Sequence, residues 1–297
     1  MPPGGILKRM NGDRPSQRAT TWRLRTRALV LPRRPLLVGI VNVTPDSFSD
    51  GGRFLDVDAA VAHALALVAD GADLIDVGGE STRPGATPVP AAVEMERVVP
   101  VIRRLVDETE APISIDTRKA AVARAALDAG AEVINDVAGF EGDPEMVGVA
   151  VESAAGLCVM HMQGTPETMQ QHPKYGDVVA EVGCYLKNRR DALIAAGVSR
   201  DRICVDPGIG FGKTFEHNLA LLEHCHALHS LGCPLLVGPS RKSFLGKLLG
   251  DDRADRTQAT VGVALGLAAQ GVQLLRVHDV RPVREALLAF EICGGLA

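Results

Sequence analysis

Eight short apolar runs recur along the 297-residue chain, and each ends in glycine or a polar residue. Near-continuous Val, Ile and Leu over four to seven residues is typical of a parallel strand that is buried on both faces. The runs therefore predict a parallel sheet. They span residues 36–42, 72–78, 112–116, 132–135, 157–161, 202–206, 234–238 and 273–278.

Helical patterns lie between these runs. Val61, Leu65 and Val68 fall at positions i, i+4 and i+7, which form one face of a helix. Six intervals also contain a glycine shortly before the next run, and we expect most of these glycines to end a helix in the left-handed conformation. They are Gly71, Gly130, Gly156, Gly197, Gly232 and Gly271.

The alternation of strands and helices predicts right-handed βαβ units. Eight units between Leu36 and about Glu291 match the roughly 250 residues of a (β/α)8 TIM barrel. A doubly wound open sheet is the alternative, because periodicity does not show whether a sheet closes. The alternating segment 22–30 predicts a hairpin that plugs the lower mouth of the barrel. We expect a single domain over residues 21–297, after a disordered leader over residues 1–20.

Composition narrows the classes of partner. The chain has 32 Lys and Arg against 36 Asp and Glu, and only 3% of its residues are aromatic. It therefore lacks the basic surplus and the stacking surface that nucleic-acid binding requires. No apolar run approaches the roughly 20 residues of a membrane span, and the N-terminus has no signal-peptide core. Six cysteines without a C-x-x-C pair fit a reduced, cytoplasmic compartment.

The ends of the runs are the candidate site. In barrels of this type, catalytic residues lie at the C-terminal ends of the strands and on the loops that follow. Two of these loops, residues 44–52 and 80–86, are long and rich in Gly, Pro or Ser, as lids and binding loops are. The candidate strand-end residues are Asn42, Asp76, Asp116, Asn135, His161, Asp206, Ser240, Arg276 and His278.

Two segments carry a family resemblance. Residues 42–52 (NVTPDSFSDGG) and 76–85 (DVGGESTRPG) closely resemble the two signature stretches of the dihydropteroate synthases, a family of pterin-binding TIM barrels. The resemblance implies condensation of (7,8-dihydropterin-6-yl)methyl diphosphate with 4-aminobenzoate in folate biosynthesis, with sulfonamides as inhibitors. It continues, in the family's order, through residues 116–117, 135–136, 160–164, 206–213, 240–243 and 276–279.

The resemblance implies a role for each residue at the pterin. Asp206 would accept the amino and ring N–H donors that lie side by side on the pyrimidine edge, and Asn135 and Asp116 would complete that edge. Lys242 would donate to the side of the ring carbonyl. Arg276 would lay its guanidinium plane over the pterin, with its charge toward the diphosphate. The remaining residues implied at this slot are Val137, Met160 and Gly238.

The resemblance also implies a diphosphate site, a metal and a second pocket. Arg276 and His278 follow the last strand, where barrels commonly bind phosphate. Asn42 would offer its carbonyl oxygen to Mg²⁺, a hard ion held otherwise by water and substrate phosphate. The catalytic residues would be Asp116, Lys242, Arg276 and His278, and the chain would form a homodimer. The implied aminobenzoate pocket consists of Phe48, Thr82, Arg83, Pro84, Phe211, Lys242 and Ser243.

The chemistry expected at such a site is dissociative. The carbon–oxygen bond would break to leave a resonance-stabilised pterin methyl cation, which the lid loops would shield from water. Two rival functions remain open. One is another pterin-binding barrel, such as a methyltetrahydrofolate methyltransferase, and the other is a non-catalytic barrel that binds a pterin without releasing diphosphate.

Several residues have simpler explanations than a site. The segment before Lys213 resembles a phosphate-binding loop, but that pattern needs glycine where Pro207 stands. We therefore expect Lys213 to be solvated at a helix start. Histidines at i and i+2 face different sides of a helix, so the local histidine cluster is expected on a surface helix rather than at a metal. Its members, together with Cys225 between the first two, are His224, His226 and His229.

Three residues at or near the strand ends have a supporting role as an alternative to a role at the site. His161 is equally a core histidine or a residue that supports the site. Asp76 is expected to tie down the loop of Glu80. Arg241 is expected to pair on the surface, while its neighbour Lys242 points inward.

Overall fold

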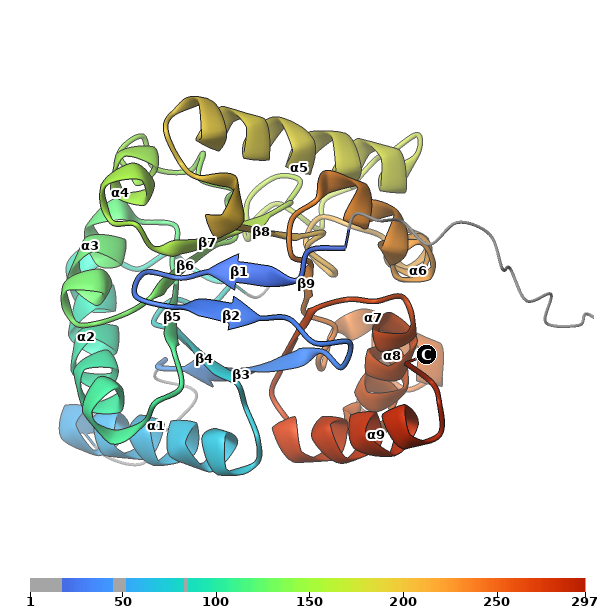
Figure 1. Ribbon diagram of the computed structural model, residues 1–297, viewed down its shortest axis with the longest axis horizontal. Coiled ribbons are helices and arrows are strands. Elements are labelled where there is room, and N and C mark those ends of the chain that lie inside the picture. The colour runs from blue at the N-terminus through green and yellow to red at the C-terminus, as the bar shows by residue number, and fades with distance from the viewer. Residues whose placement is uncertain (1–17, 45–51, 83–84, 297) are drawn as a thin grey trace, which may run out of the picture.

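The computed structural model describes residues 18–44, 52–82 and 85–296, except for the side chains of residues 52–56. Within this part of the chain, eight parallel strands form the wall of a barrel (Figure 1). They are β3 (Leu36–Asn42), β4 (Leu74–Gly78), β5 (Ile113–Asp116), β6 (Val133–Asp136), β7 (Gly156–Met160), β8 (Ile203–Asp206), β9 (Leu236–Val237) and β10 (Leu274–Val277).

The order of the strands shows that the sheet closes. Neighbours run β8-β7-β6-β5-β4-β3-β10-β9, all in parallel register. The two ends of this order meet at a parallel bridge between Val205 of β8 and Leu235, just before β9. The Val205 N–H also donates to the Pro234 carbonyl at 2.9 Å. The prediction of a TIM barrel is confirmed, and the open-sheet alternative is wrong.

Helices surround the strands, as the alternating sequence pattern predicts (Figure 1). In the described residues, β9 is followed by two α-helices, and each other barrel strand is followed by one. Two 3₁₀ helices, η1 (Arg200–Arg202) and η2 (Cys225–Leu231), precede β8 and β9. The α-helices are α1 (Gly52–Ala69), α2 (Ala91–Glu108), α3 (Ala120–Asp128), α4 (Met146–Glu152), α5 (Val178–Ala195), α6 (Phe215–Glu223), α7 (Ser243–Leu249), α8 (Thr257–Ala269) and α9 (Val280–Ile292).

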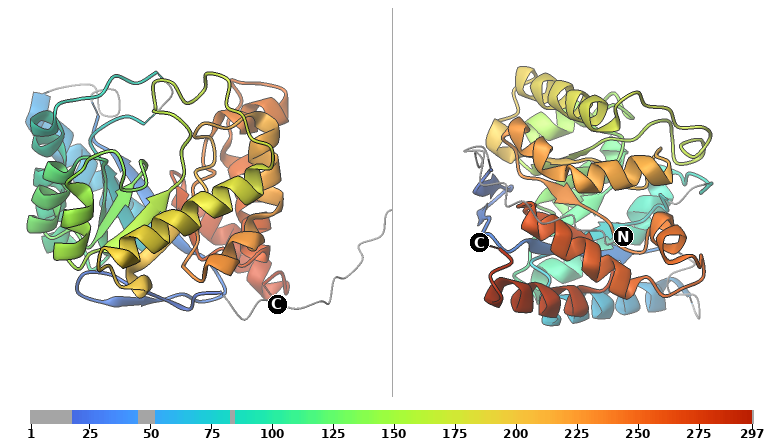
Figure 2. Two further views of the ribbon diagram at one scale, coloured as in Figure 1. Left: turned by 90° about the horizontal axis from the view of Figure 1, so that it is seen from above. Right: turned by 90° about the vertical axis from the view of Figure 1, so that its right-hand side faces the viewer.

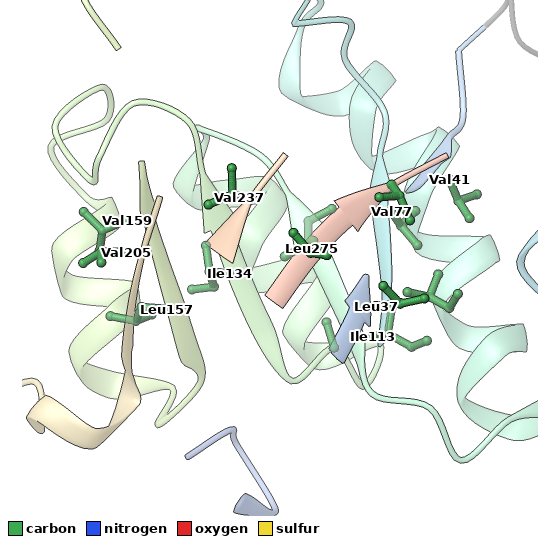
Figure 3. Close-up of a cluster of buried hydrophobic side chains, with 14 of the residues drawn as sticks. Leu37, Val41, Val77, Ile113, Ile134, Leu157, Val159, Val205, Val237 and Leu275 are labelled. Atoms are coloured by element: carbon green, nitrogen blue, oxygen red, sulfur yellow. The ribbon is translucent and has the colours of Figure 1, made fainter. Parts of the chain in front are cut away.

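The main core lies between the strands and the helices. Side chains alternate along a strand, so every second residue points out of the barrel toward a helix. Leu37 and Val41 of β3 and Val77 of β4 belong to this layer, and all are buried in one apolar cluster with helix residues such as Val98 and Leu105 (Figure 3). The continuous apolar runs of the sequence follow from this arrangement, because the inward residues below the site are apolar as well.

In five of the six connections from a helix to the next strand, the expected glycine adopts the left-handed conformation. Gly71, Gly130, Gly197, Gly232 and Gly271 all have positive φ angles, between 62° and 109°.

The sixth join differs from the other five. There Ala154 adopts the positive φ, at 55°, and Gly156 instead begins β7. A Cβ on Gly156 would lie 2.9 Å from Cδ2 of Leu24, so this glycine is needed for close packing rather than for a helix end.

An N-terminal hairpin covers the lower end of the barrel, as predicted. Strands β1 (Thr21–Arg23) and β2 (Ala28–Val30) pair in antiparallel register. Trp22 and Leu24 are each 1% exposed and pack against inward side chains of the barrel strands. The Trp22 Nε1–H donates to the Arg202 carbonyl at 2.9 Å. Figure 2 shows the hairpin at one end of the barrel and the long loops that follow the strands at the other.

Residues 18–20, which the sequence assigns to a disordered leader, contact the barrel. The Arg18 guanidinium donates to the carbonyls of Leu31, Pro32 and Gly271, at 3.2, 2.6 and 3.0 Å. The Ala19 carbonyl accepts from the Gln273 side chain at 3.1 Å. Residues 1–17 lie outside the described part of the chain. In the part that is described, none of the helices has both the length and the apolar character of a membrane span.

Candidate active site

The upper, C-terminal ends of the strands turn polar side chains into the barrel. On β4, Leu74 and Asp76 are two residues apart and so point to the same side, and Cys204 and Asp206 repeat this relation on β8. Asp76, Asp116, Asn135 and Asp206 are all buried, and Arg276 is half-buried. The inside of the barrel thus changes from apolar to charged within one side-chain layer.

Arg276 is the centre of the charged layer. Its Nε lies 2.6 Å from Oδ2 of Asp76, and its Nη2 lies 2.7 Å from Oδ2 of Asp116. The Asn135 amide donates to the same Asp76 oxygen at 3.0 Å. Burial alone would lower the pKa of Arg276, but the carboxylates of Asp76 and Asp116 outweigh burial and raise it. The expectation that Asp76 ties down the Glu80 loop is wrong, since Asp76 holds Arg276 and Asn135.

Two carboxyl groups in this layer have raised pKa values. Burial raises the pKa of Asp206 to about 6, against the N–H of Gly208, which donates to Oδ1 at 2.7 Å, and the charge of Lys242. Burial likewise raises the pKa of Asp116, against the charge of Arg276. Among the described residues, the second oxygen of Asp206 has no hydrogen-bond partner. A ligand with adjacent N–H donors could therefore donate to this oxygen.

Lys242 and an apolar cluster form the next side of the site. The Lys242 ammonium lies 4.0 Å from the centre of the Phe211 ring, a cation–π contact. Burial and Arg276 lower the pKa of Lys242 to about 8, so it carries a proton at neutral pH. Phe211 packs with Val137, Met160 and Met169 in a small buried cluster. These flat and apolar side chains beside the polar strand ends are suited to a planar heterocycle.

The loops after β9 and β10 lie side by side. The Ser240 hydroxyl lies 3.0 Å from Nδ1 of His278 and accepts from the His278 backbone N–H at 3.2 Å. Arg241 pairs with Asp279 at 2.6 Å, which confirms the expected surface pair. A Cβ added to Gly238 would lie 3.7 Å from the Cβ of Arg276, so Gly238 and Arg276 are at ordinary van der Waals contact distance.

Ser243, which is implied at the aminobenzoate pocket, is exposed as the first residue of α7.

Known proteins share this arrangement. Residues 38–278 match the family described as "Pterin binding enzyme". The dihydropteroate synthase of Synechocystis sp. is 45% identical over 254 residues, which are 85% of this chain and 88% of that protein. The dihydropteroate synthase of Escherichia coli K12 is 44% identical over 257 residues, 86% of this chain and 91% of that protein. This chain belongs to the dihydropteroate synthase family.

Solved structures of dihydropteroate synthases agree in fold. The Xanthomonas albilineans enzyme with 4-aminobenzoic acid has a TM-score of 0.86 at 46% identity and covers 93% of this chain and 98% of its own. The Burkholderia cenocepacia enzyme complexed with 7,8-dihydropteroate has a TM-score of 0.82 at 41% identity, with 93% and 97% covered. The comparisons therefore favour a dihydropteroate synthase over the two alternatives that the sequence left open, a methyltransferase and a non-catalytic barrel.

Part of the dihydropteroate synthase motif lies outside the described residues. This applies to Phe48, Arg83 and Pro84 of the expected aminobenzoate pocket. Thr82 is half-buried just before the second gap. Asn42 is half-buried at the end of β3, and its side chain has no hydrogen-bond partner in the described part of the chain.

The glycines of the dihydropteroate synthase motif after β8 have a packing role. Gly208 has a φ of +67°, and a Cβ there would lie 2.0 Å from the His161 carbonyl oxygen. Gly212, at +61°, would bring a Cβ to 2.4 Å from the Gln163 carbonyl oxygen. A glycine-rich loop after a strand is typical of a loop whose backbone approaches a ligand. The structure shows that these glycines let the loop after β8 lie directly against the loop after β7.

Two expectations about polar residues are wrong. Lys213 is 3% exposed rather than solvated, because it folds back under the loop after β8. His229 is also 3% exposed, with Nε2 at 3.0 Å from the Gln270 carbonyl oxygen, whereas His224 is exposed as expected. Among the described residues there is no group of three or more His, Cys, Asp or Glu side chains that could hold a metal.

A clasp at the base of the Glu80 loop, which the sequence motifs do not reveal, is formed by Glu80, Glu94, Arg118 and Lys119. Lys119 Nζ lies 2.6 Å from Oε2 of Glu80 and 2.5 Å from Oε2 of Glu94, and Arg118 pairs with Oε1 of Glu80 at 3.0 Å. Arg118 and Lys119 closely follow β5, so the rule that assigns function to strand ends could have found them.

Proposed function

We propose that this chain joins (7,8-dihydropterin-6-yl)methyl diphosphate to 4-aminobenzoate, giving 7,8-dihydropteroate and diphosphate, at the upper end of its barrel. One observation carries the assignment to these residues: the buried Asp206 carboxyl has an oxygen without a partner, in the same layer as Asn135, Asp116 and Arg276. A chain in this family that places acceptors and a guanidinium in one layer has the groups to hold a pterin edge and its departing anion.

Recognition of the pterin begins with Asp206. Its free oxygen accepts from the amino and ring N–H groups, and Asn135 and Asp116 complete the edge. Lys242, beside the Phe211 ring, donates to the ring carbonyl side. Met160 and Val137 cover the apolar faces, and Gly238 leaves room beside Arg276. A protonated Asp206 has only one acceptor oxygen left, so pterin binding weakens as the pH falls through about 6.

Arg276 and His278, at and just after the end of β10, assist the departure of diphosphate. Asp76 holds Arg276 by Nε at 2.6 Å, which fixes the guanidinium group across the slot, and His278 is oriented by Ser240 at 3.0 Å. Charge that develops on the leaving oxygens is stabilised by these preorganised groups. The reaction is dissociative: the neutral aniline nitrogen bonds to the pterin methyl cation, and the proton that it then loses passes to water or to the departing diphosphate, so no strong base is needed.

The residues present fit a Mg²⁺ ion that arrives with the substrate. Asn42 has an unpartnered amide at a strand end and stands without a carboxylate cluster in the described part of the chain. A single neutral oxygen suits an ion that is held mainly by diphosphate and water. When bound, Mg²⁺ neutralises charge on the leaving diphosphate.

The second substrate enters above the pterin. Thr82, Ser243 and the Phe211–Lys242 pair are the described residues of this side. The other three residues that the family motif implies, Phe48, Arg83 and Pro84, lie outside the described part of the chain. Sulfonamides compete for the same pocket. The Yersinia pestis dihydropteroate synthase, solved in a sulfonamide drug complex, is 42% identical and has a TM-score of 0.86.

The decisive experiment follows both products. The chain is incubated with the pterin diphosphate, Mg²⁺ and 4-aminobenzoate, and diphosphate and dihydropteroate are measured together. Arg276→Ala should lower kcat about 100-fold, the usual scale for a lost transition-state donor, while Arg253→Ala, an exposed arginine, should not. Pterin binding without diphosphate release by the unaltered chain would contradict the proposal.

We also propose a cytoplasmic homodimer. Cytoplasmic location is supported by six free cysteines. The dimer is supported by the outer face of α8, where Gly262 and Gly266 are exposed and a Cβ on either would meet no atom within 4 Å. Half-buried Val261 and Leu265 border this face. Small residues of this kind let two helices approach closely.

A matched pair of substitutions tests the dimer. Gly262→Arg should give a monomer in analytical ultracentrifugation. Gly148→Arg, on the exposed face of α4 and equally free of neighbours, should remain a dimer. A dimer in both variants would show that α8 is not the interface.

A further inference from the structure

Lys213 is a buried cation that the proposed reaction does not use. Its Nζ lies 2.9 Å from the Phe211 carbonyl oxygen, 3.0 Å from Nδ1 of His161 and 3.4 Å from the His161 carbonyl oxygen. These three neutral acceptors match the three N–H donors of an ammonium group. In the described part of the chain, Lys213 forms no ion pair.

Such an arrangement is costly for folding. Burial lowers the pKa of Lys213 to about 7, and the charge of Lys242 acts in the same direction, whereas Asp206 opposes it. A methionine or leucine of similar volume would avoid the desolvation cost of the ammonium. A lysine at this position therefore calls for a function that a hydrophobic residue cannot supply.

His161 is held in one orientation by the same contact. Burial and the charge of Lys213 lower the pKa of His161 to about 3, so the ring is neutral. Its Nδ1 accepts from Lys213, and the proton lies on Nε2. The ring meets Tyr185 edge-on, with centroids 4.9 Å apart, and Tyr175 lies 6.0 Å away. The Tyr175 hydroxyl donates to the Gly212 carbonyl at 2.7 Å.

Lys213 thereby joins the loops after β7 and β8. His161 directly follows β7, and Phe211 lies in the loop that begins at Asp206. Phe211 presents its ring to Lys242 and its carbonyl oxygen to Lys213, so one residue connects the buried ammonium with the side of the slot. At 3% exposure, Lys213 does not reach the slot itself. It can act only through Phe211, His161 and Asp206.

We propose that Lys213 is a positioning residue for pterin recognition, whose ammonium fixes the Phe211 backbone and the His161 ring beside the slot and whose charge adds to that of Lys242 and Arg276 near Asp206. This inference rests on the proposed function in that Asp206 is taken to grip the pterin. The effect of the Lys213 charge on Asp206 does not depend on the proposed function, because it can be measured without any substrate.

Other charged and titratable groups also lie near Asp206. Lys242, from the start of α7, and Arg276, from β10, also favour its carboxylate form, and so does the backbone N–H of Gly208. The nearby thiols of Cys158 and Cys225 have raised pKa values through the Cys204 thiol and burial, respectively, and so remain neutral. Tyr175 and Tyr185, beside His161, also have raised pKa values because they are buried, and they too are neutral. Removal of Lys213 leaves two cations in place, so a shift in Asp206 is expected rather than its complete protonation.

The first test measures Asp206 without substrate. Protein labelled with ¹³C at the aspartate carboxyls is titrated by NMR, and Asp206→Asn assigns the signal. Lys213→Met should raise the midpoint by up to about one pH unit, because it removes a positive charge that favours the Asp206 carboxylate. Lys213→Arg should restore it, and Lys187→Met, which removes an exposed lysine on α5, should leave it unchanged. An unshifted midpoint in folded Lys213→Met overturns the electrostatic role, and so does an equal shift in Lys213→Arg.

The second test measures the pterin by calorimetry between pH 5 and pH 8. Lys213→Met should move the acid limb upward by the same amount, and a full unit would weaken binding about tenfold at pH 5 and about twofold at pH 7. If Lys213→Met does not fold, His161→Asn, which keeps an acceptor near Nδ1, is compared with His161→Leu, and only the latter should lose affinity. Equal affinity in both overturns the positioning role. Failure of the unaltered chain to bind pterin would refute the proposed function, while the NMR titration would still decide the electrostatic role.

Discussion

The two ends of the barrel are built from the same strands but differ in the side chains that they bury, which are apolar at the lower end and charged at the upper end. At the lower end, Leu74 and Cys204 point inward and are sealed by Trp22 of the hairpin, with almost no exposed area. Two residues further along the same strands, Asp76 and Asp206 point inward in the charged layer. The apolar layer and the charged layer are thus only about 7 Å apart along a strand.

This contrast teaches where the stability of the molecule arises. The lower layer buries apolar area and needs few polar partners, so it favours folding directly. The upper layer holds carboxyl groups whose pKa values are raised because burial disfavours their charge. Charged groups of this kind reduce stability and are retained where a ligand needs them. We therefore expect substitutions at the two ends to separate stability from binding.

The largest expected effect is on stability at the lower end. Trp22→Ala removes a large side chain that is 1% exposed and loses its hydrogen bond to Arg202, so the free energy of unfolding should fall by about 4 kcal/mol. Urea unfolding measures this change, with Trp22→Phe as the milder control. Pterin affinity, measured at a temperature where the variant is folded, should stay unchanged. A parallel loss of affinity would mean that the two ends are coupled.

The next effect is on binding at the upper end. Asp206→Asn should weaken pterin binding about 100-fold, since it replaces an acceptor of two charge-assisted hydrogen bonds. Calorimetry measures this loss, and Asp107→Asn, an exposed aspartate on α2, is the control. An unchanged affinity in Asp206→Asn would remove Asp206 from the pterin site.

The same substitution should increase stability. The folded pKa of Asp206, about 6, lies above its ordinary value of 3.8, so the folded state holds this proton more tightly. Its contribution therefore favours folding below pH 4 and is lost as the pH rises through 6, a difference of about 3 kcal/mol. Asp206→Asn should lack this pH dependence and exceed the unaltered chain in stability at pH 8. A less stable variant at pH 8 would contradict this sign.

The sequence predicts the lower end and the scaffold better than it predicts contacts at the upper end. Apolar periodicity is sufficient for the strands, their number and the hairpin, but closure of the sheet is known only from the bridge between Val205 and Leu235. The strand-end rule brings Asp76, Asp116, Asn135, Asp206 and Arg276 into one layer, as the structure has them. Their roles at the substrates remain predictions.

Pairings within the upper layer are not local in sequence. Arg276 meets Asp76 across 200 positions, and Lys213 meets His161 across 52. A lysine next to glycine at a helix start is usually solvated, and only the packing of two neighbouring loops buries this one. Hydrophobic patterns carry no information on such contacts, so the burial of Lys213 could not be derived, and the strand-end rule could have found Arg118 and Lys119 but not their partners.

The smallest expected effect also separates the two ends. Gly156→Ala adds a methyl group 2.9 Å from Cδ2 of Leu24, where the hairpin meets β7, so it should lower the free energy of unfolding by about 1–2 kcal/mol through overpacking. Gly148→Ala, on exposed α4 with no atom near its new methyl group, should instead raise it by up to about 1 kcal/mol, because alanine favours a helix. Opposite signs in urea unfolding, with equal pterin affinity in both variants, would assign the effect of Gly156 to contact with the hairpin. Equal signs would show that the hairpin yields to the added methyl group, and the lower end would then be less tightly packed than its burial indicates.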